Sequence, residues 1–118
     1  VFGGFIWSHI LLEDLDRFLN GIAGFLKPGG TLVFTDCSAV AGTKHDLKNI
    51  VKTDDRGNTF QNRTLEDGSL HLVLKNFPTK EFLAQKLSTI ADEINFTELE
   101  YYWITSCKLK DQISRISA

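Results

Sequence analysis

The feature that most constrains the fold is a strand pattern, a helix pattern and a second strand pattern within the first 35 residues. Residues 2–7 form a nearly continuous apolar run, as strands buried on both faces of a parallel sheet do. Apolar residues then recur at helical spacing over residues 15–26, and residues 31–35 form a second apolar run. Because a strand–helix–strand unit of this size has parallel strands and a right-handed crossover, we predict an α/β fold.

A proline–glycine turn separates the predicted helix from the second strand. Proline at position 28 pre-sets φ for a turn, and Gly29 tolerates the positive φ that follows. The pair Gly29-Gly30 also invites interpretation as a phosphate-binding loop. The pair precedes a strand, however, so it lies at the amino end of the sheet, whereas ligands bind outside the carboxyl ends. We therefore interpret it as a turn.

The middle of the chain predicts a loop followed by a β-hairpin. Residues 38–57 are polar and indicate a loop or lid with at most a short helix. Residues 59–65 and 70–74 are β-prone runs, and the Asp67-Gly68 pair between them supplies the positive φ of a hairpin turn. We therefore predict a hairpin insertion at about residues 58–75.

The last third of the chain predicts a helix and then extended structure. Thr79 can cap a helix whose apolar positions run to Ile94. Residues 97–109 alternate as a strand does, either as one long strand or as two short ones. We predict that residues 1–110 form the domain and that residues 111–118 are a frayed tail.

Composition excludes several classes of protein. The net charge is −2, with 13 basic and 15 acidic residues scattered along the chain, so we expect no nucleic-acid partner. No apolar run approaches the roughly 20 residues that span a bilayer, so we expect no membrane segment. The two cysteines fit neither a zinc site nor a disulfide framework, which favours the cytoplasm and no metal. Because the chain has no methionine, we expect a piece of a longer protein.

Two groups of motifs resemble one known family. Phe5-Ile-Trp-Ser-His9, a helix, and then Phe25-Leu-Lys-Pro-Gly-Gly-Thr-Leu-Val-Phe-Thr-Asp36 are similar to the fourth strand, fourth helix and fifth strand of class I S-adenosylmethionine-dependent methyltransferases. The segments 57–63, 67–71 and 73–79 resemble a bacterial branch of that superfamily that acts on small molecules. Tyr101-Tyr-Trp103 is similar to the last strand of that branch.

The resemblance covers nearly the whole chain, from Phe2 to about Leu109. It implies a Rossmann-like sheet with helices packed on it, of which this chain is the C-terminal half, with S-adenosylmethionine as cofactor and a small molecule as substrate. It also implies that a first strand with a Gly-x-Gly-type loop and an acidic residue ending the second strand precede Val1. No residue of this chain can therefore be assigned to the methionine portion or the ribose of the cofactor.

The predicted site lies where the two parallel strands end. Trp7, Ser8 and His9 follow the first strand and Asp36 ends the second, so they flank one crevice. Methyl transfer requires alignment of the reacting atoms and removal of a proton from a neutral acceptor. We predict His9 and Asp36 as catalytic residues and Trp7 and Ser8 as cofactor-binding residues. The alternatives are that His9 or Asp36 caps the following segment and that Trp7 belongs to the core.

The hairpin supplies a second group of candidate residues. Gln61 and Arg63 lie on it and Asn76 lies beyond it, where the hairpin can cover the crevice. We predict these three as substrate-binding residues, because an arginine fork can hold a carboxylate. The alternative is that exposed hairpin charges serve solubility.

We therefore predict a methyltransferase that moves a methyl group to an oxygen or nitrogen of a small molecule. One alternative is a nucleotide-binding oxidoreductase, although the chain lacks a dinucleotide fingerprint. A second alternative is a non-catalytic interaction module. If the first three strands of the family sheet are absent, the strand at residues 2–7 presents an unpaired apolar edge, and we expect self-association through it.

Overall fold

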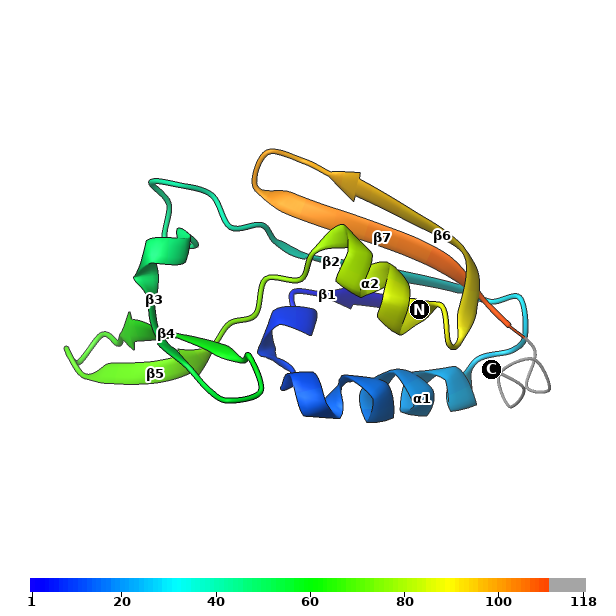
Figure 1. Ribbon diagram of the computed structural model, residues 1–118, viewed down its shortest axis with the longest axis horizontal. Coiled ribbons are helices and arrows are strands. Elements are labelled where there is room, and N and C mark those ends of the chain that lie inside the picture. The colour runs from blue at the N-terminus through cyan, green and yellow to red at the C-terminus, as the bar shows by residue number, and fades with distance from the viewer. Residues whose placement is uncertain (111–118) are drawn as a thin grey trace.

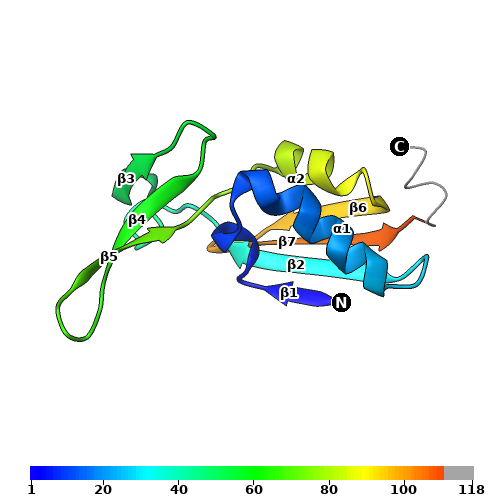
Figure 2. The same cartoon turned by 90° about the horizontal axis from the view of Figure 1, so that it is seen from below.

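A computed structural model describes residues 1–110 of the chain, and the predicted tail at residues 111–118 lies outside the described residues. The main body is a four-stranded sheet with two helices on one face, and a smaller three-stranded sheet stands at one end of it (Figures 1 and 2). The main sheet has the order β1 (Phe2–Gly4), β2 (Thr31–Cys37), β7 (Tyr102–Leu109) and β6 (Ala91–Glu98). The helices are α1 (Leu15–Phe25) and α2 (Lys80–Leu87). The small sheet has the order β3 (Ile50–Thr53), β4 (Thr59–Thr64) and β5 (Leu70–Leu74).

The predicted βαβ unit is confirmed. Strands β1 and β2 are parallel, with Phe2 opposite Val33, and α1 connects them. Gly29 has φ 79° and donates its amide hydrogen bond to the carbonyl oxygen of Leu109, 2.9 Å away, at the amino end of β2. The interpretation of Gly29-Gly30 as a turn is therefore confirmed, and so is the α/β fold class.

The first strand is shorter than predicted. It ends at Gly4, because Phe5 adopts φ 59°, a left-handed conformation that turns the chain out of the strand. Residues Trp7–His9 then form a short 3-10 helix, η1, and residues Leu12–Asp14 form a second one, η2, before α1 begins. The prediction that residues 2–7 form one strand was wrong at its carboxyl end.

The second helix is also shorter than predicted. Thr79 caps α2 as expected, since its hydroxyl oxygen accepts a hydrogen bond from the amide of Phe82 at 3.1 Å. The helix ends at Leu87, however, and Ile94 lies in strand β6. Strand β6 has a register shift between Asp92 and Asn95, and this bulge breaks the alternation that would have identified a strand. Residues 97–109 are therefore parts of two strands, because β6 and β7 form an antiparallel pair.

The predicted hairpin is confirmed as β4 and β5, with Gly68 at φ 82° in the turn between them. The polar segment before it is more ordered than predicted. It contains a 3-10 helix, η3 (Leu47–Asn49), and strand β3, which pairs with β4 and completes the small sheet. This strand was missed because its residues Val51, Lys52 and Thr53 are exposed and carry no buried apolar pattern.

One face of the main sheet carries the core. The buried apolar residues of this core come from both helices, η1, alternate positions of β2 and β7, and the start of β6 with the residue before it: Trp7, Leu15, Leu19, Ala23, Leu32, Phe34, Leu83, Leu87, Ile90, Ala91, Trp103, Cys107 and Leu109. Among the described residues the opposite face is half-buried or exposed, so the prediction of strands buried on both faces was wrong for this part of the chain. No helix within residues 1–110 is long and apolar enough to cross a membrane.

Candidate functional site

The carboxyl ends of β1 and β2 meet at one edge of the main sheet, as predicted. The backbone amide of Ser8 donates a hydrogen bond to the Asp36 carboxylate at 2.9 Å, and the amide of Phe5 donates one to the carbonyl oxygen of Thr35 at 2.8 Å. The indole of Trp7 anchors this edge to the core through edge-on contacts with Phe34 and Trp103. We refer to Trp7, Ser8, His9 and Asp36 as the rim.

Asp36 is the centre of a buried polar network. Its side chain is excluded from solvent and accepts hydrogen bonds from the amides of Ser8 and Cys37, at 2.9 and 2.7 Å. The ammonium group of Lys75 lies 3.3 Å from Asp36 Oδ1 and donates a hydrogen bond to the hydroxyl of Ser8 at 3.0 Å. Asp36 thus holds the shape of the rim, and its predicted catalytic role stays a prediction.

Lys75 is a site residue that the sequence analysis missed. It directly follows strand β5 and is only 3% exposed. Lysine is almost never fully buried without a partner, so a lysine at the end of the apolar run Leu70–Leu74 was the available signal. Through Lys75 the small sheet is tied to the carboxyl edge of the main sheet.

Asn76 connects the same two parts of the molecule. Its side-chain oxygen accepts from the amide of Thr59 at 2.9 Å, and its side-chain nitrogen donates to Asn58 Oδ1 at 3.1 Å and to the carbonyl oxygen of Ile10 at 3.3 Å. Its backbone amide donates to the carbonyl oxygen of Ser8 at 2.8 Å. The predicted substrate-binding residue therefore lies against the rim with its amide group engaged by the protein.

His9 is exposed at the outer side of the rim. Its Nδ1 lies 2.8 Å from the carbonyl oxygen of Leu74. A carbonyl oxygen only accepts hydrogen bonds, so Nδ1 carries the hydrogen, and in the neutral ring Nε2 has the free lone pair. His9 therefore binds the small sheet with one nitrogen and presents a proton acceptor with the other, and it does not cap the following helix.

Gln61 and Arg63 lie on strand β4, away from the rim. Gln61 is buried, and its side-chain nitrogen has no hydrogen-bond partner among residues 1–110. Arg63 is exposed opposite His71 on β5, and within the described part of the chain it forms no ion pair. The structure places both side chains on the same face of the small sheet, because residues two apart on a strand point the same way. It does not bring them into contact with Ser8, His9 or Asp36.

A cavity of about 400 Å³ borders the carboxyl end of β2, and its lining includes Phe5, Cys37, Ser38, His45 and Tyr102. Burial lowers the pKa of His45, and the nearby charges of Lys75 and Lys44 lower it further. The imidazole is therefore neutral at physiological pH. Burial raises the pKa of the Cys37 thiol, so that side chain is protonated. No group of three or more potential metal-binding side chains occurs within residues 1–110.

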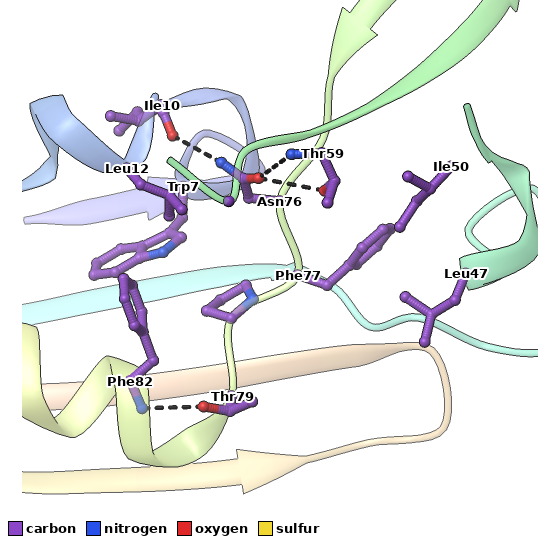
Figure 3. Close-up of a pocket in the computed structure, with 12 residues that line it drawn as sticks. Trp7, Ile10, Leu12, Leu47, Ile50, Thr59, Asn76, Phe77, Thr79 and Phe82 are labelled. Carbon is purple, nitrogen blue, oxygen red and sulfur yellow. Dashed lines mark hydrogen bonds between the residues drawn. The ribbon is translucent and has the colours of Figure 1, made fainter. Parts of the chain in front are cut away.

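A second cavity, of about 240 Å³, opens between the rim, the small sheet and the start of α2 (Figure 3). We call it the Trp7 cavity. Its lining consists of twelve residues: Trp7, Ile10, Leu12, Leu47, Ile50, Gly57, Thr59, Asn76, Phe77, Pro78, Thr79 and Phe82. Trp7 and Phe82 lie on one side of it, and Leu47, Ile50 and Phe77 lie on the other (Figure 3).

No protein-family model matches the chain, and no curated protein is similar to it. Several solved structures share its fold. A DhpI–SAH complex matches with a TM-score of 0.66 and 20% identity over 93% of this chain and 46% of that one. A complex of DhpI with SAM and HEP matches with a TM-score of 0.69 and 18% identity over 92% and 49%. A SAM-dependent methyltransferase from Methanosarcina mazei matches with a TM-score of 0.65 and 16% identity over 93% and 58%.

The chain spans about half the length of the solved structures that it matches. Each match covers at least 92% of this chain. The chain therefore has the α/β fold of SAM-dependent methyltransferases, over about half of that fold.

Proposed function

We propose that the chain is the C-terminal half of a cytoplasmic S-adenosylmethionine-dependent methyltransferase that acts on an oxygen or nitrogen of a small molecule. One observation supports this most strongly. The rim is held together by the hydrogen bond from Ser8 to the buried Asp36, at the sheet edge where α/β proteins bind ligands. The solved structures with this fold include complexes with SAM and SAH. No observation on residues 1–110 favours an oxidoreductase or a non-catalytic module.

The residues of this chain fit one side of such a cofactor. Directly after strand β1, Phe5 and Ile6 expose apolar side chains, and a flat ring can pack on this surface. Phe5 also has φ 59°, and strained backbone of this kind is concentrated at ligand sites. The predicted role of Ser8 in cofactor binding stays a prediction, and its amide, carbonyl and hydroxyl groups are all bonded to protein groups. Ser8 therefore supports the shape of this surface.

When bound, S-adenosylmethionine would supply a methyl group on a cationic sulfur, and SAH would be the leaving group. A neutral hydroxyl or protonated amine must also lose a proton. Within this chain, Nε2 of His9 is free to accept that proton, because Nδ1–H is held by Leu74. Asp36 and Lys75 fix the rim that carries His9. Arg63 is exposed on β4, and its predicted role in substrate binding stays a prediction.

A measurement of SAH formation tests this function even while the acceptor is unidentified. The native protein that contains this chain is incubated with S-adenosylmethionine and a panel of small hydroxyl and amine compounds. We expect acceptor-dependent SAH, and we expect His9→Gln to lower the rate about 10²- to 10⁴-fold, the contribution that is typical of a general base. His71→Gln on the exposed hairpin is the matched control. The proposal fails if the protein forms no SAH and binds no S-adenosylmethionine.

We also propose that this chain by itself, without the strands that the family resemblance places before Val1, associates with a second copy through β1. This strand is the edge of the main sheet, and within the described residues nothing pairs with its outer side. Phe2 is 68% exposed there, and Val1 is also exposed. Apolar edge strands of this kind pair with other chains.

A further inference from the structure

The Trp7 cavity has the size of a small-molecule site. An apolar cavity of about 150 Å³ in a protein core binds benzene. The volume here is about 240 Å³, which leaves room for a ring with one or two substituents. The walls are mainly apolar side chains from η1, η3, β3 and α2, so a flat apolar ligand would contact protein on several sides (Figure 3).

The polar groups of the lining indicate that the ligand is uncharged. No Asp, Glu, Lys, Arg or His lines the cavity. The side-chain amide of Asn76 is bonded to Thr59, Asn58 and Ile10, and the hydroxyl of Thr79 accepts from Phe82 (Figure 3). A charged ligand would therefore lose its water without gaining a partner, which is costly in free energy.

Trp7 adds one directional requirement. The residue is only 1% exposed, and its indole points into the cavity beside Phe82 (Figure 3). Within residues 1–110 the indole nitrogen of Trp7 forms no hydrogen bond to the protein, and unlike the nitrogen of Trp103 it is not fully buried. It can therefore donate a hydrogen bond to a group in the cavity. A ligand oxygen in this cavity can accept that hydrogen bond.

The cavity also adjoins the rim. Trp7 directly precedes Ser8, and Asn76 donates its backbone hydrogen bond to Ser8. Phe77, in the opposite wall, lies under the ammonium group of Lys75, which is 5.9 Å from the ring centroid. A ligand held in the cavity therefore has one end near the Ser8–Asp36–Lys75 network.

We propose that the Trp7 cavity binds an uncharged apolar compound, a ring or a branched chain, that carries one hydrogen-bond acceptor oxygen facing Trp7. Resting on the proposed function, we further infer that this compound is the methyl acceptor or its apolar portion. The methyl acceptors of the proposed reaction would then have an uncharged apolar portion that fits the cavity. Binding of such a compound to the cavity can be tested without any methyl transfer.

Acetophenone is a suitable probe because it combines a ring with one acceptor oxygen. Isopropylbenzene has a similar shape without the oxygen, and benzoate adds a charge. The chain has two tryptophans, so it contributes two indole N–H signals to ¹⁵N spectra of the protein. The signal that disappears in Trp7→Phe belongs to Trp7. We expect acetophenone to shift the Trp7 signal and leave the Trp103 signal in place, and we expect benzoate at the same concentration to shift neither. A shift of the Trp103 signal alone, or equal binding of benzoate, would overturn the proposal.

Two variants separate the cavity from general effects. Trp7→Phe keeps an aromatic ring but removes the N–H donor, so we expect acetophenone binding to weaken about three- to tenfold, as loss of one hydrogen bond gives, and isopropylbenzene binding to change less than about twofold. Leu47→Phe enlarges an exposed residue of the lining and should weaken both probes. Its control is Leu70→Phe, a similarly exposed leucine outside the lining, which should change neither. Unchanged binding in Leu47→Phe would contradict the proposal even if Trp7→Phe does not fold.

A competition experiment distinguishes this inference from the proposed function. If saturating S-adenosylmethionine displaces acetophenone, the cavity belongs to the cofactor and the inference is wrong while the methyltransferase proposal stands. If acetophenone binds as expected but the protein forms no SAH with any acceptor, the binding site is supported and the proposed function fails. If the compounds that the protein methylates fail to compete with acetophenone for binding, the assignment of the cavity to the methyl acceptor is wrong.

Discussion

Lys75 and Asp36 form an ion pair at 3.3 Å although 39 residues separate them, and both side chains are buried. The pair joins the small sheet to the carboxyl edge of the main sheet, because Lys75 follows β5 and Asp36 lies in β2. Ser8 completes the arrangement by bonding to both residues. The position of the rim therefore depends on a charged group supplied by a distant part of the chain.

Removing one member of this pair should strongly destabilise the protein. Lys75→Met leaves the Asp36 carboxylate buried without its cation, and we expect a loss of about 3–5 kcal/mol in the free energy of unfolding, measured by urea denaturation. Lys108→Met breaks the exposed pair with Glu93 and should cost less than about 1 kcal/mol. The double variant Lys75→Met, Asp36→Asn removes the unpaired charge and keeps a side-chain oxygen that can accept from the amide of Ser8 or Cys37, so it should regain part of the loss. Equal effects of Lys75→Met and Lys108→Met would contradict the buried pair.

The close packing of β1 on β2 should make Gly3 intolerant of a side chain. A Cβ at Gly3 would lie 2.7 Å from the ring of Phe34, which is itself buried in the core. We expect Gly3→Ala to cost about 1–3 kcal/mol, as overpacking does. Gly21 in α1 has no atom within 4 Å of the corresponding position, so Gly21→Ala should stabilise the helix by about 0.5–1 kcal/mol. Thermal denaturation of both variants should therefore give shifts of opposite sign.

His45 should make stability depend on pH. Burial lowers its pKa in the folded protein below its ordinary value of 6.5, so the unfolded chain binds a proton at a pH where the folded protein does not. The resulting stabilisation is fully present above pH 6.5 and is lost as pH falls through the lowered pKa. His45→Gln should flatten the slope of unfolding free energy against pH in that window. An unchanged slope in His45→Gln would contradict the burial of this imidazole.

In the chain by itself, without preceding strands, the exposed edge of β1 should control self-association. Replacing Phe2 with lysine places a charge on the edge and removes an apolar contact worth about 1.5–3 kcal/mol, so we expect Phe2→Lys to raise the dimer dissociation constant about tenfold or more. Phe25→Lys is the control, since Phe25 is 91% exposed but belongs to α1 and not to the edge strand. Sedimentation velocity measures both. The proposal is wrong if the unaltered protein remains monomeric at high concentration.

Sequence patterns predicted the part of the fold that depends on local periodicity. The βαβ unit, the Thr79 cap and the turn at Gly68 were all predicted because each depends on spacing or on a residue with a special conformation. Strand β6 was not predicted. Ile90 and Ile94 lie at helical spacing in the sequence, and the bulge in β6 interrupts the alternation of a regular strand. The left-handed Phe5 was also missed, since only tertiary packing explains a bulky residue at positive φ.

The candidate site was predictable only where it follows from topology. The adjacency of Ser8 and Asp36 follows from two parallel strands that end at one edge. The roles of Lys75 and Asn76 depend on how the small sheet folds back on the rim, and no local pattern encodes that contact. For the same reason the cavity beside Trp7 could not be predicted from the sequence.

Photo-cross-linking tests the central claim most directly. The native protein that contains this chain is irradiated with labelled S-adenosylmethionine, digested with trypsin and mapped by mass spectrometry. Because Arg17 is the first basic residue of the chain, the end of β1 and the segment Trp7–His9 fall within the peptide that ends at Arg17. The account predicts label in that peptide, and the label should disappear when SAH is added in excess. Label confined to the peptides of the small sheet, or label that SAH does not compete away, would contradict the account.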